Sequence, residues 1–222
     1  EWVAVSHLHP DHYGGILGII SELTVDRVIY HGRPLDLPHK AVTLRRESTS
    51  ESGRHKSVSR EPLLWSEVTE ALALRHIPLI AQEQMEEEWG LLRLRWLFGA
   101  PPDHLKENDA SLALLIESIE SPQRRVLLSG DLEAAGELRL RTMWRSLGLR
   151  GAELSVWHIN HHGSGTSTAM ETVQTLRPRL GVLSLDGAHR FAFPHPRTVA
   201  TLEARGVRRV RLDLAGDYTF LF

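Results

Sequence analysis

Side chains that bind divalent cations are concentrated in one short run, Ser6-His7-Leu8-His9-Pro10-Asp11-His12. His7 and His9 are two positions apart, so in extended backbone both imidazoles point to the same side and would hold one ion together. Asp11 and His12 are adjacent at the start of a predicted helix, where a turn would aim both at a second ion nearby. The run therefore predicts a metal site; the alternative, an accidental polar loop, requires this spacing of ligand types to arise by chance.

The carboxylate of Asp131 is a candidate bridge between two cations. It follows Gly130 at the end of an apolar strand predicted over residues 125–128. Two-metal hydrolases hold their ions ~3.5–4 Å apart, a separation that one carboxylate can span. A strand that ends in Gly-Asp is also common in ordinary turns, so this prediction depends on the histidine run. We expect Glu133 to act as a carboxylate at a helix N-terminus.

A second group of histidines follows another apolar strand, predicted over residues 154–159. Either His161 or His162 would complete the shell of the second ion. Gly163 and Ser164 would offer a backbone N–H and a hydroxyl to an oxyanion. His158 lies inside the strand, where a histidine is more often a core or supporting residue than a ligand.

Residues 189–196, His-Arg-Phe-Ala-Phe-Pro-His-Pro, form the last polar cluster. Three roles stay open for His195 at the start of a predicted helix: a metal ligand, a proton donor to the leaving group, or a helix cap. Arg190 is a candidate phosphate clamp, because a guanidinium contacts phosphate through two N–H groups, and it is equally an exposed arginine.

The chain of 222 residues suits a single α/β domain spanning residues 1–222. Predicted strands alternate with helices, and every polar cluster follows a strand, as binding sites do in open α/β sheets. Residues from about 36–62 include few apolar side chains and are predicted to form a mobile surface loop. Thr168 and Glu171 predict a capping box at a helix start, and residues 218–222 predict a final strand.

Composition excludes several classes of protein and site. Cysteine is absent, so any zinc or manganese site must use histidine and carboxylate ligands, and there is no disulfide framework. The formal net charge of −2 gives no general electrostatic case for nucleic-acid binding. No apolar run reaches the roughly 18 residues of a membrane span, and no signal peptide is visible. Because residues 2–5 already form a predicted strand, we expect the sequence to be a fragment of a longer chain.

These motifs resemble one known superfamily. The run from His7 to His12 is similar to the signature of the metallo-β-lactamase fold superfamily, and Gly130-Asp131 is similar to its bridging aspartate. Three further segments, residues 108–112, 161–164 and 190–196, resemble the C-terminal hydrolase domain of ComEC-type DNA-uptake competence proteins. The resemblance covers nearly the whole chain, from residue 2 to residue 222.

The resemblance implies an α/β fold of the four-layer αββα sandwich type. It places two divalent metal ions, zinc or manganese, at one edge of two facing sheets. It also implies several strands ahead of the first histidine motif, which are missing from this sequence. Where the β-lactamase branch has a further histidine, this chain has Asn108, so the number of bound ions stays open.

For function, the resemblance implies hydrolysis of nucleic-acid phosphodiesters. The expected partners are DNA and a membrane channel domain on the same or another chain. As part of a ComEC-like protein the domain would be extracytoplasmic and membrane-associated, whereas a stand-alone relative would be cytoplasmic. The oligomeric state stays open.

Three hypotheses follow for the activity. In the first, the chain is a metal-dependent phosphodiesterase acting on DNA. We expect His7 and His9 to hold one ion, and Asp11, His12 and His161 to hold a second. Asp131 is expected to bridge the two ions. His162 or His195 is expected to contact the phosphate or to transfer a proton. In the second, the same centre hydrolyses a β-lactam, lactone or thioester. In the third, the site is degenerate and the domain only binds nucleic acid.

Overall fold

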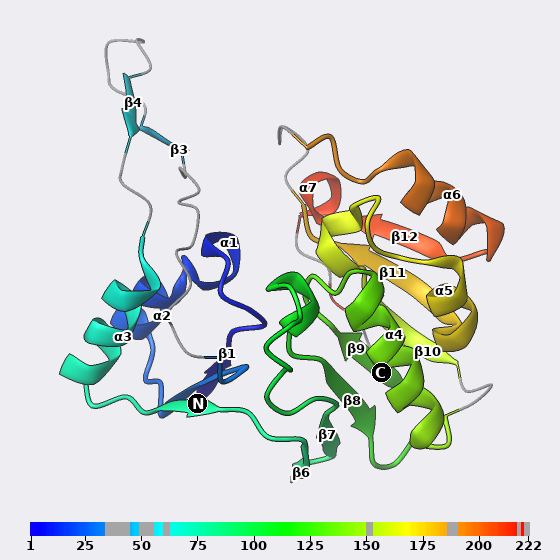
Figure 1. The fold of residues 1–222 in the computed structure, drawn as a ribbon, viewed down its shortest axis with the longest axis horizontal. Helices are drawn as coiled ribbons and strands as arrows, with labels where there is room; N and C mark the ends of the chain where they lie inside the picture. Colours follow the sequence, from blue (N-terminus) through cyan, green and yellow to red (C-terminus); the bar gives the residue numbers. More distant parts are fainter. Residues whose placement is uncertain are drawn as a thin grey trace.

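The computed structural model describes residues 1–33, 63–149, 153–185, 191–216 and 219, together with the backbone of residues 45–48 and 56–59. These residues build a three-stranded sheet, a seven-stranded sheet and a two-stranded hairpin (Figure 1). The strand predicted over residues 218–222 lies almost entirely outside this description.

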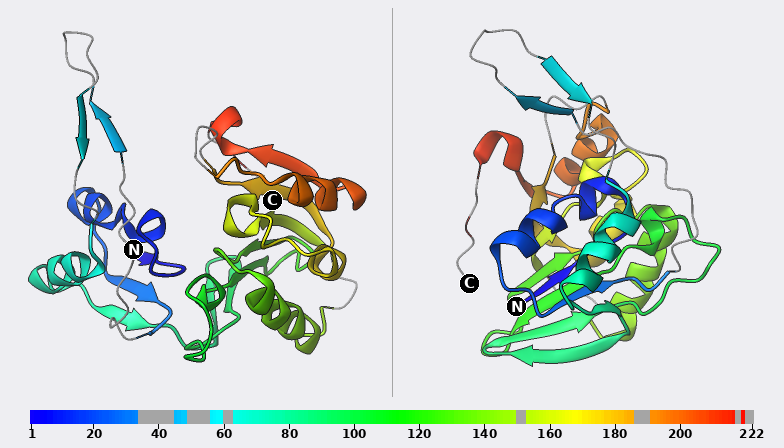
Figure 2. Two further views of the ribbon diagram at one scale, coloured as in Figure 1. Left: turned by 45° about the horizontal axis from the view of Figure 1, so that its top comes forward. Right: turned by 90° about the vertical axis from the view of Figure 1, so that its left-hand side faces the viewer.

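The loop predicted at about residues 36–62 also lies largely outside the described residues. Within it, β3 (Arg45–Ser48) and β4 (Lys56–Ser59) pair as an antiparallel hairpin, which the composition did not predict. Figure 2 shows the two strands standing apart from both sheets.

The smaller sheet comes from the N-terminal part of the chain. Its strands run parallel in the order β1-β2-β5, as the alternation of strand and helix predicted. Helix α3 buries Trp65, Val68 and Leu72 at helical spacing. The elements are β1 (Trp2–Ala4), α1 (Pro10–Tyr13), α2 (Ile16–Glu22), β2 (Arg27–Tyr30), α3 (Trp65–Leu74) and β5 (Leu79–Ala81).

The larger sheet has the strand order β12-β11-β10-β9-β8-β7-β6. Neighbours from β6 to β9 are antiparallel, whereas β9 to β12 run parallel, so the carboxyl ends of these four strands lie at one edge. The strands are β6 (Met85–Trp89), β7 (Leu92–Trp96), β8 (Leu114–Ser118), β9 (Arg125–Leu128), β10 (Leu154–His158), β11 (Pro178–Leu183) and β12 (Arg208–Arg211). The helices are η1 (Asn108–Ala110), α4 (Ala134–Ser146), η2 (Asn160–Gly163), α5 (Met170–Leu176), α6 (Pro196–Ala204) and α7 (Leu212–Ala215).

Secondary structure packs in four layers. Trp2 of β1 contacts Trp96 of β7 with ring centroids 5.7 Å apart, within an apolar cluster shared by the two sheets. Helices α1 to α3 bury the outer face of the small sheet. Helices α4, α5 and α6 cover the outer face of the large sheet around the fully buried Trp144 and Trp157 (Figure 1). The α/β, four-layer αββα arrangement predicted from the resemblance is therefore present.

The described helices of this chain do not resemble membrane spans. Among the described residues, no helix combines the length and the apolar character that crossing a bilayer requires.

The start of α5 departs from the predicted capping box. Ala169, not Thr168, is the N-cap residue, and no side chain caps the helix. Thr168 has left-handed backbone, with φ 60°, and its N–H donates to the buried carboxylate of Glu137. The prediction was wrong because a hydrogen bond to another helix replaces the local one.

Glu137 joins α4 to the segment that leads into α5. Its carboxylate is fully buried and accepts hydrogen bonds from the backbone of Thr168 and Ala169, from the Thr172 hydroxyl at 2.6 Å, and from the Asn160 amide at 2.9 Å. Burial raises the pKa of Glu137, and these four donors oppose the rise. Because Asn160 begins the second histidine cluster, the network fixes that cluster relative to α4.

Replacing this carboxylate tests the network. Glu137→Gln should lower the free energy of unfolding by about 1–3 kcal/mol, because an amide N–H₂ group must then face a donor. The raised pKa means that Glu137 contributes most stability below its ordinary value of 4.5, and that this contribution is lost as pH rises through the folded-state value. The free energies of unfolding of the parent and of Glu137→Gln, measured with urea, should therefore differ most at the acid end of the pH range. A difference that grows with pH would contradict the assignment.

The core of α4 offers a matched pair of leucines. Leu140→Ala should lower the free energy of unfolding by about 2–5 kcal/mol, because the side chain is 0% exposed and its removal leaves a cavity. Leu138→Ala, on the same helix but 54% exposed, should change it by less than about 0.5 kcal/mol. Urea unfolding measures both, and equal effects would show that the buried face of α4 is misassigned.

Candidate metal centre

The first histidine run lies at the carboxyl end of β1. The N–H of Val5 still donates into the small sheet, at 2.8 Å, and the chain turns after it. His9 is extended, with φ −91° and ψ 145°, and Pro10 then begins α1, since proline fits the first turn of a helix. This strand-to-helix turn brings the rings of His7 and His12 together, with centroids 4.0 Å apart.

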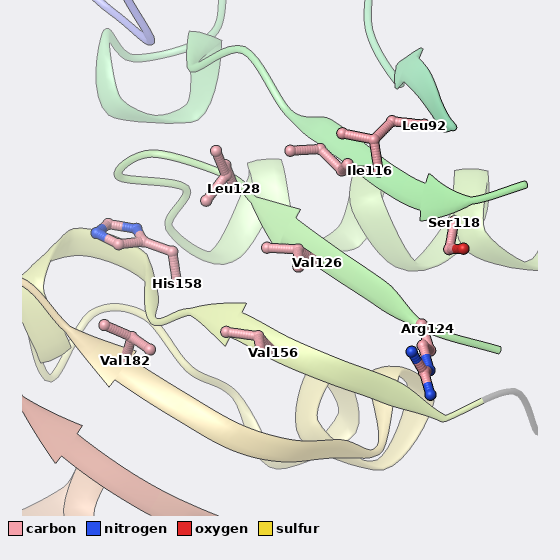
Figure 3. A pocket seen from close by; sticks show the side chains of 9 residues that line it. All are labelled: Leu92, Ile116, Ser118, Arg124, Val126, Leu128, Val156, His158 and Val182. Atoms are coloured by element: carbon pink, nitrogen blue, oxygen red, sulfur yellow. The ribbon is translucent and has the colours of Figure 1, made fainter. Parts of the chain in front are cut away.

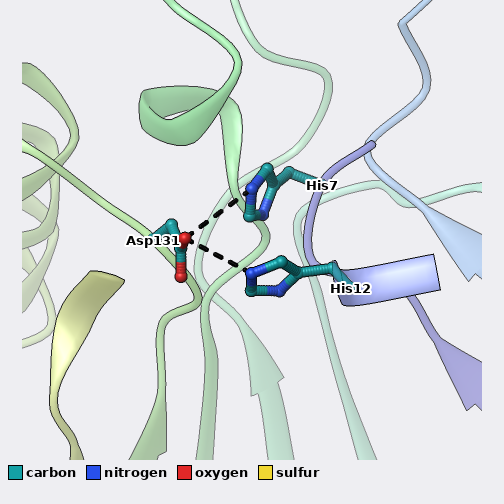
Figure 4. A group of neighbouring side chains, drawn as sticks. All are labelled: His7, His12 and Asp131. Carbon is teal, nitrogen blue, oxygen red and sulfur yellow. Dashed lines mark ion pairs between the residues drawn. The ribbon is translucent and has the colours of Figure 1, made fainter. Parts of the chain in front are cut away.

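Asp131 is the centre of the cluster. It follows β9, is 2% exposed, and faces His7 and His12 from the opposite sheet (Figure 4). The distances from its Oδ2 atom to imidazole Nε2 atoms are 3.3 Å for His12, 3.6 Å for His162, 3.8 Å for His161 and 3.9 Å for His7. Segments that follow β1, β9 and β10 therefore converge at one edge of the two sheets.

Two groups of three side chains have the spacing of metal ligands. One is His7, His12 and Asp131, and the other is Asp11, His12 and His162. Within each group, the ligand atoms lie within 4.8 Å of one another. Two ligands of a tetrahedral zinc ion with bonds of ~2.0–2.1 Å lie about 3.4 Å apart. The separations from Asp131 are of this size, so the cluster has room for a cation among its donors.

Several of the converging atoms are buried without a hydrogen-bond partner among the described residues. They include Nε2 of His12, Nε2 of His162 and Oδ1 of Asp131. An unsatisfied buried polar group costs about 1–3 kcal/mol, and a coordinated cation would satisfy all three. Imidazole and carboxylate donors suit zinc, manganese or iron. The residues present therefore fit divalent cations.

The second histidine pair depends on an uncommon backbone. His161 and His162 have φ 48° and 53°, in the left-handed region that side chains other than glycine rarely adopt. Gly163 follows with φ 84°, and a Cβ added there would lie 2.8 Å from Pro194. The N–H of His161 donates to the Gly130 carbonyl at 3.2 Å, which ties the pair to the segment of Asp131. Such a conformation persists where the surroundings fix it.

Neighbouring oxygens hold the second ring nitrogen of several imidazoles, as they do for histidines that bind metals. Ser6 Oγ lies 2.9 Å from His12 Nδ1, Ser111 Oγ lies 3.2 Å from His7 Nδ1, and the Ser184 carbonyl lies 2.6 Å from His162 Nδ1. A carbonyl oxygen only accepts, so Nδ1 of His162 carries the hydrogen and Nε2 faces the cluster. Glu133 lies 3.2 Å from Nδ1 of His161.

Electrostatics separates the histidines into two kinds. Burial lowers the pKa of His7 well below its ordinary value and also lowers the pKa of His9. Both imidazoles are therefore neutral at pH 7, which is the form that binds metals. Burial opposes protonation of His162 as well, but the carboxylate of Asp11, 3.4 Å from its Nε2 atom, and the charge of Asp131 raise its pKa to about 9.

A buried ion cluster holds the first histidine run from behind. Glu107 accepts hydrogen bonds from the N–H of Leu8 and from Nε2 of the fully buried His31, both at 2.7 Å. Arg33 lies 3.4 Å from the same carboxylate. Burial opposes ionisation, but His31, Leu8 and Arg33 lower the pKa of Glu107 to about 2. A charged Glu107 thus fixes the backbone between His7 and His9.

The structure brings most of the predicted site residues together. His7, His12, Asp131, His161 and His162 form the cluster, while Asp11 lies 3.4 Å from His162 and His9 lies 2.9 Å from His7. The groups with ligand spacing differ from the predicted ones, because they contain His162 and share His12.

The remaining predicted residues lie outside the ligand groups. His195 takes one of its three open roles, since its side chain caps α6 by accepting from the N–H of Arg197 at 3.2 Å. His158, expected as a core or supporting residue, lines an apolar pocket of about 370 Å³ with Val126, Val156 and Val182 (Figure 3). Arg190 lies outside the described residues.

Sequence reasoning missed the residues that support the cluster. Ser6 and Glu133 stand next to predicted ligands, so their position was a usable signal. Glu107 had none, because its contact with Leu8 spans 99 positions of the sequence. Asn108, the residue at the position of an expected histidine, lies 3.5 Å from His161.

Comparison with known proteins agrees with this geometry. The chain is 28% identical over 131 residues to ComE operon protein 3 of Bacillus subtilis, a match covering 59% of this chain and 16% of that protein. It is 29% identical over 108 residues to Recombination protein 2 of Haemophilus influenzae, covering 49% and 13%. It is 25% identical over 142 residues to Competence protein ComA of Neisseria gonorrhoeae, covering 63% and 20%. The matches thus span a fifth or less of each relative, and no family model matches the chain.

Among solved structures, a variant of the CmlA beta-hydroxylase shares the architecture. The TM-score is 0.52, the match covers 95% of this chain and 42% of that chain, and the identity is 14%. Identity this low shows the fold alone, and that fold is the metallo-β-lactamase fold. The resemblance expected from the sequence is confirmed: the chain is similar in sequence to ComEC-type competence proteins and has a metallo-β-lactamase fold.

Proposed function

We propose that this chain is a metal-dependent phosphodiesterase that acts on DNA. The observation that carries the proposal is the convergence of four imidazoles on the buried carboxylate of Asp131, at 3.3–3.9 Å. No apolar contact or backbone turn requires this arrangement, whereas cation binding does. The names of two relatives, a competence protein and a recombination protein, support DNA as the substrate.

The chemistry of His12 supports an assignment of two ions. An imidazole nitrogen gives its lone pair to one ion, and Nδ1 of His12 faces Ser6, so His12 serves a single centre. We assign it to the ion held with Asp11 and His162. His7 would then share the other ion with His9, whose Nδ1 lies 2.9 Å from His7 Nε2, and Asp131 would be a ligand of both ions.

Bound cations would supply an activated water near neutral pH and would neutralise charge on the phosphate. The chain's own residues would hold the substrate and move the proton. His161 and Glu133 form an imidazole–carboxylate pair whose Nε2 faces Asp131 at 3.8 Å. We assign proton transfer to the leaving oxygen to this Nε2 atom, and ligation to His162, which exchanges the two roles expected from the sequence.

The cellular context is also a proposal. The relatives are several times longer than this chain, and their names refer to competence and recombination. We propose that the domain works beside a membrane channel domain, on the same or another chain, in an extracytoplasmic and membrane-associated position.

Metal stoichiometry tests the ligand assignment. The parent protein, stripped with chelator and reloaded, should bind two zinc or manganese ions, and His12→Ala should bind no more than one. Loading should raise the melting temperature, because ligand at a hundred times its dissociation constant adds about 2.7 kcal/mol. Elemental analysis and thermal unfolding measure both effects. His104→Ala, at an exposed histidine, is the control, and a His12→Ala protein that loads like the parent would refute the assignment.

Hydrolysis tests the activity. Metal-loaded protein should cleave DNA and a bis-aryl phosphodiester. Asp131→Asn should lower kcat/KM by more than about 100-fold, which exceeds the effect typical of a residue that only hydrogen-bonds to a metal ligand. Asp26→Asn, at an exposed carboxylate, should leave the rate unchanged.

Two outcomes of the hydrolysis assay would replace the proposal. Turnover of a chromogenic cephalosporin without phosphodiester cleavage would favour a carbonyl substrate. Tight DNA binding that is insensitive to chelator, with no cleavage and no bound metal, would indicate a degenerate binding domain.

A further inference from the structure

Ser111 joins two of the candidate ligands through one hydroxyl group. Its side chain is 0% exposed, and its Oγ atom accepts a hydrogen bond from the backbone N–H of Asp131 at 3.1 Å. The same oxygen lies 3.2 Å from Nδ1 of His7. His7 follows β1 of the small sheet and Asp131 follows β9 of the large sheet (Figure 4). A single buried oxygen therefore links the two halves of the candidate metal centre.

The fold itself holds this hydroxyl group in place. The N–H of Leu112 donates to the Ser6 carbonyl at 2.8 Å, which ties the segment before β8 to the first histidine run. Gly130 leaves room for the hydroxyl group, because a Cβ at that position would lie 2.8 Å from Ser111 Oγ. Backbone hydrogen bonds and close packing thus fix where the Ser111 oxygen lies relative to both ligands.

The hydrogen on the His7 ring decides whether that ring can bind an ion. A backbone N–H only donates, so Asp131 uses one lone pair of Ser111 Oγ and the second lone pair can accept from His7. A neutral imidazole carries one hydrogen, either on Nδ1 or on Nε2. With the hydrogen on Nδ1, the lone pair of Nε2 faces the cluster, 3.9 Å from Asp131 Oδ2. With the hydrogen on Nε2, His7 has no lone pair there for an ion.

We propose that Ser111 is a positioning residue of the metal centre, which holds His7 in the tautomer with hydrogen on Nδ1 and at the same time holds the backbone of Asp131. His9 fits this tautomer, because its Nδ1 lies 2.9 Å from Nε2 of His7 and can donate to that lone pair in the metal-free protein. Hydrogen-bond partners of metal-binding histidines fix the tautomer in this way. This inference rests on the proposed metal-dependent function.

The tautomer of His7 can be measured by NMR on metal-free protein with 15N-labelled histidine, in chelator at pH 7. Long-range 1H–15N correlation spectra distinguish a ring hydrogen on Nδ1 from one on Nε2, and His7→Gln identifies the His7 signals by their loss. The parent should show the Nδ1–H form. Ser111→Ala should lose this form or mix it with the Nε2–H form, because the acceptor is gone. A parent with the hydrogen on Nε2 overturns the inference, whether or not any variant folds.

Zinc affinity gives a second readout, measured by competition with a chromophoric chelator. Ser111→Ala should weaken zinc binding about 10–100-fold, the loss typical of removing a hydrogen-bond partner of a metal ligand. Ser129→Ala is the matched control, since Ser129 is also 0% exposed and its hydroxyl group bonds to Asn160 and Trp157. The control should keep the His7 tautomer and the zinc affinity of the parent.

The outcomes separate this inference from the proposed function. If the loaded parent cleaves DNA but Ser111→Ala keeps the Nδ1–H form and the zinc affinity, the positioning role is refuted and the phosphodiesterase proposal stands. If both readouts depend on Ser111 but the loaded parent cleaves nothing, the positioning role is supported and the hydrolytic function is refuted. If Ser129→Ala causes the same changes, loss of any buried hydroxyl group explains them and the inference is overturned.

Discussion

A single buried carboxylate imposes the constraint on which the rest of the structure depends. Asp131 is 2% exposed, and a carboxylate removed from water is unstable unless positive charge or hydrogen-bond donors surround it. The pKa of Asp131 is nevertheless lowered, because burial is outweighed by His12 and the neighbouring imidazoles. Divalent cations would meet the same need more strongly. The strand ends, the left-handed histidine pair and the first histidine turn all place nitrogen atoms around this one group.

Two further carboxylates fix the histidine segments to the scaffold. Glu107 accepts the N–H of Leu8 behind the first run, and Glu137 accepts the amide of Asn160 behind the second. Each is buried or nearly so and has several donors, so losing one contact would leave a buried polar group unsatisfied. Loops that bear ligands are commonly mobile, but here buried hydrogen bonds tie them to the packed layers. Rings held in this way need little reordering when a cation binds.

The cluster has different surroundings on its two sides. Toward the scaffold, the hydroxyl groups of Ser6 and Ser111 contact the rings of His12 and His7. On the side of residues 191–195 it continues into stacked aromatic rings that reach solvent. The apolar pocket around His158 lies on the large sheet and is lined mostly by aliphatic side chains, so it has little to offer a charged substrate.

The sequence alone determined the ligand types, their place after strands, and the alternation of strand and helix, because these depend on residues close together in the chain. The run from His7 to His12, Asp131 after β9 and the start of α6 after His195 all follow from such local patterns. Only the tertiary structure decided which imidazole faces which carboxylate, since both His161 and His162 have left-handed backbone that distant contacts fix. It also decided the start of α5, because the N–H of Thr168 donates to Glu137 on another helix. In the same way it decided the role of Glu107, which accepts a hydrogen bond from Leu8, 99 positions away in the sequence. A hydrogen bond between remote segments leaves no trace in the spacing of residues, so the supporting carboxylates could be found only once the chain was folded.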